Sequence, residues 1–157
     1  MKCPAYLLRI IKIFESKSEL LTSHKFQFES NAVLAIVKGD LYSEGIWQNH
    51  KKMRGKITVP VSYGRNGKPE KRSNADWYNQ ELKTLIEVEA GISVTNYKFL
   101  KDLFQACVMI DIEYLIIVVR QVHRNSKEFD KVIQLMDALF APNRLSLPLN
   151  GILVIAY

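Results

Sequence analysis

Residues 85–90 read Leu-Ile-Glu-Val-Glu-Ala, and the interpretation of the whole chain depends on this stretch. Its apolar residues predict a strand. Because side chains alternate along a strand, Glu87 and Glu89 lie on one face of it. Two carboxylates so close together repel each other unless a cation or solvent lies between them. Packing alone does not explain these charges in a central strand, so we expect chemistry here.

A third acid is predicted to join this pair. If the preceding hairpin is centred between Glu81 and Leu82, Asp76 lies directly opposite Glu87 on the neighbouring strand and on the same face. Hard cations such as Mg²⁺ take oxygen ligands, and proteins commonly hold them with one or two carboxylates together with substrate phosphates. The alternative is a strand with one solvated face, from which both glutamates point into water.

A basic segment precedes these acids. Between residues 51 and 72 the chain has eight basic residues and one acid, so this window carries a charge of +7, against +6 for the whole chain. Such an excess suits a polyanion, because each cation that contacts a phosphate releases condensed counterions. The alternative is a solvated loop that aids solubility. The predicted nucleic-acid contacts are Lys51, Lys52, Arg54, Lys56, Arg65, Lys68, Lys71 and Arg72.

The composition is that of an ordinary globular protein, with 157 residues, 48% of them hydrophobic and 24% charged. The most apolar N-terminal stretch is interrupted by Arg9 and Lys12, so we expect neither a signal peptide nor a membrane span. The two cysteines, Cys3 and Cys107, have no metal or redox spacing. We therefore expect one domain over residues 1–157, a cytoplasmic location, two free thiols and no membrane partner.

Periodicities along the chain predict an α/β fold with one mixed sheet. Apolar residues at helical spacing predict helices, and alternating or continuous apolar runs predict strands. The first three strands follow one another directly and form an antiparallel meander, whereas the later strands are separated by helices and run parallel. The predicted elements are a helix over 5–22, a helix over 30–41, strands over 57–62, 73–78 and 83–90, a helix over 97–110, a strand over 113–120, a helix over 126–141 and a strand over 152–155.

The helix over residues 97–110 has an apolar face that we expect to pack on the sheet, and Asn96 is placed to cap it. Near its start, Lys98 and Lys101 either contact a phosphate or form a solvated face beside a plain cap. The predicted buried face consists of Tyr97, Leu100, Phe104, Cys107 and Val108.

An acid on one strand, Glu-X-Lys or a variant of it on the next, and then a helix and a buried strand resemble the core of the PD-(D/E)XK nuclease superfamily. Residues 86–91, Ile-Glu-Val-Glu-Ala-Gly, have Glu89 where most of that superfamily has lysine, and they are similar to the BamHI/BglII type of restriction endonuclease. The resemblance covers residues 30–157. Its motif is short. The order of the helices and strands and the basic window also agree with that superfamily. The implied fold is restriction-endonuclease-like.

The resemblance implies roles for four residues. Asp76 and Glu87 would be catalytic metal ligands and the Val88 carbonyl a further ligand, with Mg²⁺ as the cofactor and Mn²⁺ as its substitute. Glu89 would orient or deprotonate the attacking water, or contact a second metal. Because a glutamate cannot supply the positive charge of the usual lysine, the cation must stabilise the transition state. Ala75 stands where the family has proline, a departure that bears on the role of Asp76.

Two functions follow from this interpretation. The first is a Mg²⁺-dependent endonuclease that hydrolyses phosphodiester bonds of DNA. It would act as a homodimer, because one site per chain faces the two strands of a duplex. The second is a non-catalytic nucleic-acid-binding or assembly module that retains the nuclease fold.

Overall fold

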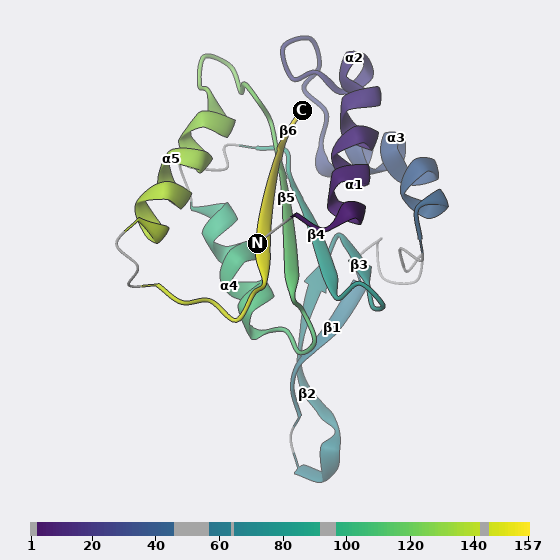
Figure 1. Cartoon of the computed structure of the whole chain (residues 1–157), viewed down its shortest axis with the longest axis vertical. Coiled ribbons are helices and arrows are strands. Elements are labelled where there is room, and N and C mark those ends of the chain that lie inside the picture. The colour runs from purple at the N-terminus through teal and green to yellow at the C-terminus, as the bar shows by residue number, and fades with distance from the viewer. Residues whose placement is uncertain (1–2, 46–56, 64, 92–96, 142–144) are drawn as a thin grey trace.

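The computed structural model describes residues 3–45, 57–63, 65–91, 97–141 and 145–157, and it describes only the backbone of residues 57–63, 65 and 69–74. The strands of the main sheet in these segments are β3 (Trp77–Asn79), β4 (Thr84–Glu89), β5 (Tyr114–Val119) and β6 (Gly151–Ala156). They lie in the order β3-β4-β5-β6, with β3 antiparallel to β4 and the other neighbours parallel (Figure 1). The predicted α/β class, antiparallel first and parallel later, is confirmed.

Helices cover both faces of this sheet (Figure 1). One face carries α1 (Ala5–Ser16), α2 (Ser18–Leu21) and α3 (Ser30–Ser43), and the other carries α4 (Lys98–Val108) and α5 (Glu128–Phe140). Ile86 and Val88 of β4 belong to the core on the first face, and Leu85 belongs to the core on the second. β4 and β5 are therefore buried on both faces, which agrees with the unbroken apolar run of β5.

The predicted antiparallel meander is interrupted at Asp76. β1 (Ile57–Tyr63) and β2 (Pro69–Ala75) pair with each other in a separate two-stranded sheet that projects from the body of the molecule (Figure 1). The predicted strand over 73–78 is therefore wrong as a single strand, because β2 ends before the bend and β3 begins after it. The turn that joins β1 to β2 contains Asn66 and Gly67 at φ 63° and 70°, a region that these two residue types tolerate.

The register of the β3–β4 hairpin is as predicted. Trp77 pairs with Ile86 and Asn79 pairs with Thr84, so the hairpin is centred between residues 81 and 82. Asn79 Oδ1 accepts a hydrogen bond from the Leu82 N–H at 2.9 Å, which holds the turn.

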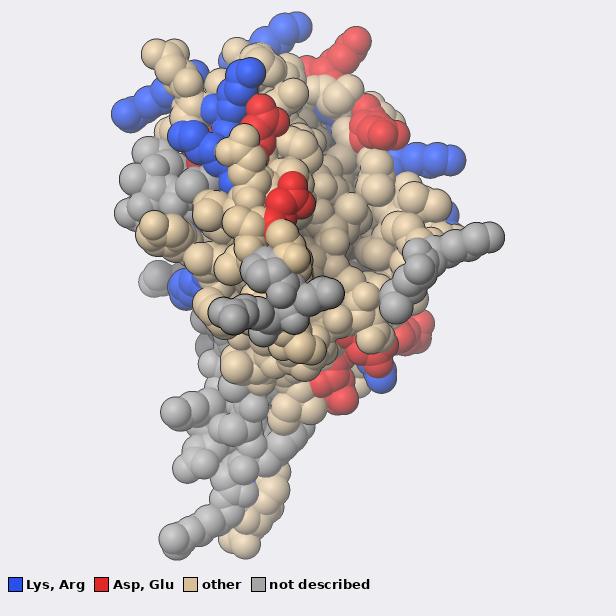
Figure 2. Space-filling view, turned by 60° about the vertical axis from the view of Figure 1, so that its left-hand side comes forward, with Lys and Arg blue, Asp and Glu red and all other residues tan. Residues whose placement is uncertain are grey.

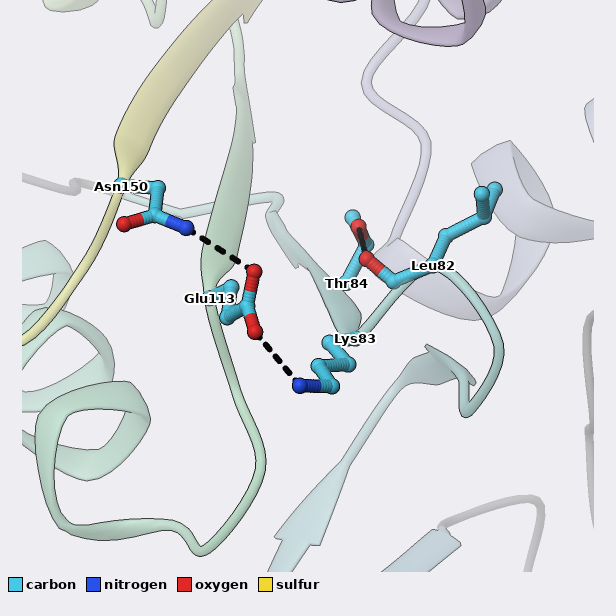
Figure 3. Close-up of polar contacts among 5 residues, drawn as sticks. All are labelled: Leu82, Lys83, Thr84, Glu113 and Asn150. Carbon is cyan, nitrogen blue, oxygen red and sulfur yellow. Dashed lines mark hydrogen bonds and ion pairs between the residues drawn. The ribbon is translucent and has the colours of Figure 1, made fainter.

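Side-chain hydrogen bonds join the starting ends of the parallel strands (Figure 3). Lys83 Nζ donates to Glu113 Oε1 at 2.6 Å, and Asn150 Nδ2 donates to Glu113 Oε2 at 2.9 Å. The Thr84 hydroxyl donates to the Leu82 carbonyl at 2.7 Å. The Glu113 carboxylate is thus paired with the Lys83 ammonium group and the Asn150 side-chain amide.

The face that α4 turns to the sheet differs from the predicted one. Phe99, Leu103 and Ala106 are buried. Phe104 and Val108, which were predicted inside, are 58% and 55% exposed. The helix has two apolar stripes at helical spacing, and periodicity alone does not choose between them. The predicted cap, Asn96, lies outside the described residues, and the N-cap position is occupied by Tyr97 in a left-handed conformation (φ 49°), exposed like Phe104.

Several other predictions can be compared with the structure. The first predicted helix is two helices, because the chain leaves helical geometry at Lys17 (φ −102°, ψ 7°). α5 begins at Glu128 rather than at residue 126. Both cysteines are free, as predicted. Within the described ranges, no helix combines the length and the apolar character that a bilayer crossing requires.

The orientation of α4 can be tested with two neighbouring residues. Leu103→Ala should lower the free energy of unfolding by about 2–5 kcal/mol, because it removes a buried side chain and leaves a cavity. Phe104→Ala, which removes a larger but exposed side chain, should change it by less than about 1 kcal/mol. Urea denaturation of both variants measures the difference. The reverse ranking would show that the exposed stripe, not Leu103, faces the sheet.

Candidate functional site

A cavity of about 650 Å³ opens where β4 ends, between the start of α3 and the first turns of α4. Five acids and two lysines line it, so with every acid ionised these side chains carry a net charge of −3. The three acids predicted from the sequence are brought together in this one cavity. Its polar and charged side chains are Glu29, Ser30, Asn31, Asp76, Glu87, Glu89, Lys98, Lys101, Asp102 and Gln105.

Asp76 lies at the bend between β2 and β3. Asp76 and Glu87 are the residues next to the last pair of the β3–β4 ladder, Trp77 with Ile86, and both line the cavity. Asp76 Oδ2 accepts a hydrogen bond from the Val88 N–H at 3.0 Å. The Asp76 side chain thus satisfies the Val88 N–H of β4 at the bend between β2 and β3.

Glu87 and Glu89 do not face bulk solvent. Glu87 is 8% exposed, and the Glu89 side chain is 13% exposed. By alternation both lie on the same face of β4 as Leu85, under α4, where they line the cavity. The alternative of a strand with one solvated face is therefore wrong, because β4 is covered on both sides.

The Val88 carbonyl, implied as a metal ligand, already accepts a hydrogen bond. The Ser30 hydroxyl donates to it at 2.6 Å, across the 58 residues that separate them. Ser30 is the first residue of α3, and its side chain binds the strand rather than its own helix. A carbonyl oxygen has two lone pairs, so one remains for a further partner.

Asp102 is the acid that the sequence analysis missed. It lies on the buried face of α4, is 8% exposed and lines the cavity. Burial raises its pKa to about 8, and a hydrogen bond to Glu89 and the charge of Glu89 act in the same direction. The signal was available in the sequence. Asp102 interrupts the apolar stripe of Phe99, Leu103 and Ala106, but that stripe was not the one assigned to the core.

The two lysines of α4 offset part of this negative charge. Lys98 Nζ lies 3.6 Å from Glu89 Oε2, and the lysine side chain is 55% exposed. An exposed pair at this distance contributes little free energy. Lys101 opposes the rise in the pKa of Asp102. The lysines therefore leave the cavity negative.

The donor set of the cavity fits a hard divalent cation. Carboxylates, a backbone carbonyl and neutral oxygen donors are the ligands that Mg²⁺ and Mn²⁺ prefer, and the crowded charge favours a cation. Within the described part of the chain, however, no three His, Cys, Asp or Glu side chains are arranged to hold one metal ion together. The expected convergence of Asp76, Glu87 and Glu89 on a single ion is therefore not seen in this conformation.

The predicted nucleic-acid contacts are described only in part. Lys51, Lys52, Arg54 and Lys56 lie outside the described residues, and only the backbone of Arg65, Lys71 and Arg72 is described. Lys68 is exposed at the tip of the β1–β2 hairpin. On the face in Figure 2, the described lysine and arginine side chains gather mostly at the end of the molecule opposite this hairpin. The basic window remains a prediction.

Comparisons with known proteins leave the family open. No protein-family model, no curated protein and no solved structure matches this chain. The likeness to the PD-(D/E)XK nucleases therefore depends on the motif and the element order, and the cavity must be interpreted from its own chemistry.

The raised pKa of Asp102 predicts how stability depends on pH. Because the folded state holds this proton more tightly than the unfolded state, the metal-free protein loses stability as the pH rises from about 4 to about 8. Asp102→Asn removes the charge and keeps a hydrogen-bond donor for Glu89. At pH 8 it should stabilise the fold by an amount on the order of 1–3 kcal/mol, and at pH 4 the gain should vanish.

Thermal or urea denaturation across this pH range, in buffer with a chelator, measures the effect. Asp137→Asn is the matched control, because Asp137 is an exposed aspartate of α5. A gain that is the same at pH 4 and pH 8, or a loss at pH 8, would contradict the assignment.

Proposed function

We propose that the protein is a Mg²⁺-dependent endonuclease that hydrolyses phosphodiester bonds of DNA, with a restriction-endonuclease-like fold. One observation carries the proposal: the cavity at the end of β4 gathers carboxylates from a chain bend, a buried strand and a helix. A site that only binds a polyanion gains nothing from buried negative charge beside the phosphates. A site that holds a cation between the carboxylates and a phosphate does gain from it.

Asp76 and Glu87 would hold the cation in this proposal. Asp76 Oδ2 accepts a hydrogen bond from the Val88 N–H, and Asp76 and Glu87 line the same cavity. The Ser30 hydroxyl donates to the Val88 carbonyl and leaves one lone pair of that oxygen for the ion. A bound Mg²⁺ would polarise the phosphate and lower the pKa of a bound water.

Glu89 and the two lysines of α4 would act on the substrate itself. Glu89 lines the same cavity as Glu87 and would accept the proton of the attacking water. Lys98 and Lys101 lie in the first turns of α4, where an ammonium group and the helix N-terminus both favour a phosphate. Residues 51–72 would hold the DNA backbone, and a homodimer would present one such cavity to each strand of a duplex.

The alternative function keeps one specific observation in its favour. No three carboxylates of the described residues are set around a single ion position, as they would be in a fully assembled metal site. A non-catalytic module that binds nucleic acid with its basic residues would not need that arrangement. The two functions differ in whether a divalent cation makes the protein cut.

Cleavage assays separate the two functions. With Mg²⁺ or Mn²⁺, the wild-type protein should nick or linearise a supercoiled plasmid, and it should not do so with a chelator. Glu87→Ala should lower the cleavage rate by at least about 100-fold, because the cation loses a ligand. DNA affinity, measured by fluorescence anisotropy, should stay unchanged or increase, because without metal the carboxylate only repels phosphate.

Glu81→Ala is the control, because Glu81 is exposed in the β3–β4 turn and does not line the cavity. Plasmid, single-stranded DNA and RNA should all be offered as substrates. If the protein binds one of them and cuts none, the nuclease function is wrong and the binding module takes its place.

A further inference from the structure

The chain between β5 and α5 makes a tight turn over residues 123–126. His123 and Ser126 exchange two backbone hydrogen bonds, at 2.9 and 3.0 Å, around Arg124 and Asn125. Arg124 has a left-handed backbone (φ 54°), a conformation that suits glycine and is unfavourable for a residue with a Cβ. Such a conformation persists where the surrounding structure enforces it. The turn therefore presents Arg124 from a fixed backbone position.

Arg120 anchors the base of this turn. It is 4% exposed, and its Nη1 donates to His123 Nδ1 at 2.5 Å and to Gln27 Oε1 at 2.8 Å. Its Nη2 donates to the Phe28 carbonyl at 2.5 Å. The turn and the segment over residues 22–28 are thus joined through one buried side chain. A surface held in this way loses little conformational entropy when it binds a partner.

The surface formed by these two segments is basic. Residues 22–28 and 120–127 contain four basic residues, Lys25, Arg120, Arg124 and Lys127, and no acid. Apart from Arg120, these side chains are exposed and form no ion pair or hydrogen bond with the described residues. Both segments lie at the end of the molecule opposite the β1–β2 hairpin (Figure 1), where lysine and arginine side chains gather on the face in Figure 2. Such cations are available to the phosphates of a polyanion.

The base of the turn adjoins two walls of the cavity. Arg120 follows Val119, the last residue of β5, and Val119 pairs with Glu89, which lines the cavity. Arg120 also binds the carbonyl of Phe28, and the next residue, Glu29, lines the cavity as well. The basic surface therefore begins beside the carboxylates.

One DNA molecule can contact the turn and the cavity together. Arg124 lies four residues beyond Arg120, a separation of at most about 14 Å even in an extended chain. A DNA strand covers that length in about four nucleotides. The cavity repels phosphate by itself, because its side chains carry a net charge of −3 with every acid ionised. Cations beside it favour the approach of the DNA backbone.

We infer that the turn over residues 123–126 is a DNA-binding element, in which Arg124 and the adjoining Lys127 contact backbone phosphates beside the cavity. The inference rests on the nucleic-acid binding of the proposed function, which the endonuclease and the binding module have in common. It adds to residues 51–72 a second basic surface from a different part of the chain. The left-handed backbone of Arg124 fits this role, because a cation on a fixed turn contacts phosphate without the cost of ordering a loop.

Fluorescence anisotropy with a duplex of about 20 base pairs, in buffer with a chelator, tests the two contacts. Arg124→Gly and Lys127→Ala should each raise the Kd by about 5- to 10-fold at about 0.1 M salt, because each removes one phosphate contact. Each should also reduce the magnitude of the slope of log K against log salt concentration by about 1.

Lys12→Ala is the matched control for the loss of one charge. Lys12 is an exposed lysine of α1 that forms no ion pair with the described residues. Its removal should change the Kd by less than about 2-fold, because a charge that contacts no phosphate is screened by salt.

Arg124→Gly also separates DNA binding from a structural role. Glycine adopts the left-handed backbone without strain, so the melting temperature of this variant should equal or exceed that of the wild type while its DNA affinity falls. An arginine that only held the turn would give the opposite result, a lower melting temperature with unchanged DNA affinity.

The outcomes separate this inference from the proposed function. Wild-type affinity and salt dependence in both turn variants, or an equal loss of affinity in Lys12→Ala, would overturn the inference and leave the endonuclease untouched. Weaker binding by both turn variants, with no cleavage by the wild type, would support the inference and overturn the endonuclease. If Arg124→Gly does not fold, Lys127→Ala decides. A wild-type protein that binds no nucleic acid would overturn both.

Discussion

The burial of two glutamates at the end of a covered strand is the constraint on which the rest of the structure depends. β4 packs against helices on both faces, so Glu87 and Glu89 lie largely buried beside the cavity and not on an open face of a sheet. Asp102 of α4 and Asp76 at the β2–β3 bend add their charge to the same cavity. A fold that keeps these acids together carries an electrostatic cost, which the proton held by Asp102 offsets in part and which the proposed cation would offset further.

Two side-chain hydrogen bonds to the backbone of Val88 hold the end of β4 in place. Val88 donates its N–H to Asp76 and accepts a hydrogen bond from Ser30 on its carbonyl, so a chain bend and the start of a helix meet at one residue. The contrast with the other end of the sheet is informative. There the carboxylate of Glu113 has a lysine at 2.6 Å and an amide at 2.9 Å, which leaves it no need for an ion (Figure 3).

The sequence was sufficient for the features that depend on local pattern. The change from antiparallel to parallel strands was predicted from the order of the elements, and the register of the β3–β4 hairpin was predicted from a turn centred between Glu81 and Leu82. The face of α4 was predicted wrongly, since two apolar stripes have equal helical spacing and only the packing of Phe99 against the sheet selects one. Asp102 was missed for the same reason.

The break between β2 and β3 and the contact of Ser30 with β4 were also beyond prediction. Both depend on a side chain that binds a distant backbone group, and such a contact leaves no periodic signal in the sequence. Residues 51–72 illustrate a different limit. Their charge excess is plain in the sequence, but composition alone does not say which of these cations contact a phosphate.

The central claim is that the carboxylates at the end of β4 hold a divalent cation. Crystals soaked in Mn²⁺ and measured at the manganese absorption edge test it most directly. The account predicts an anomalous peak in the cavity, with carboxylate oxygens of Asp76 and Glu87 at about 2.0–2.2 Å and an octahedral shell completed by water. A well-ordered cavity without a peak, or a peak only at surface carboxylates elsewhere, would contradict it.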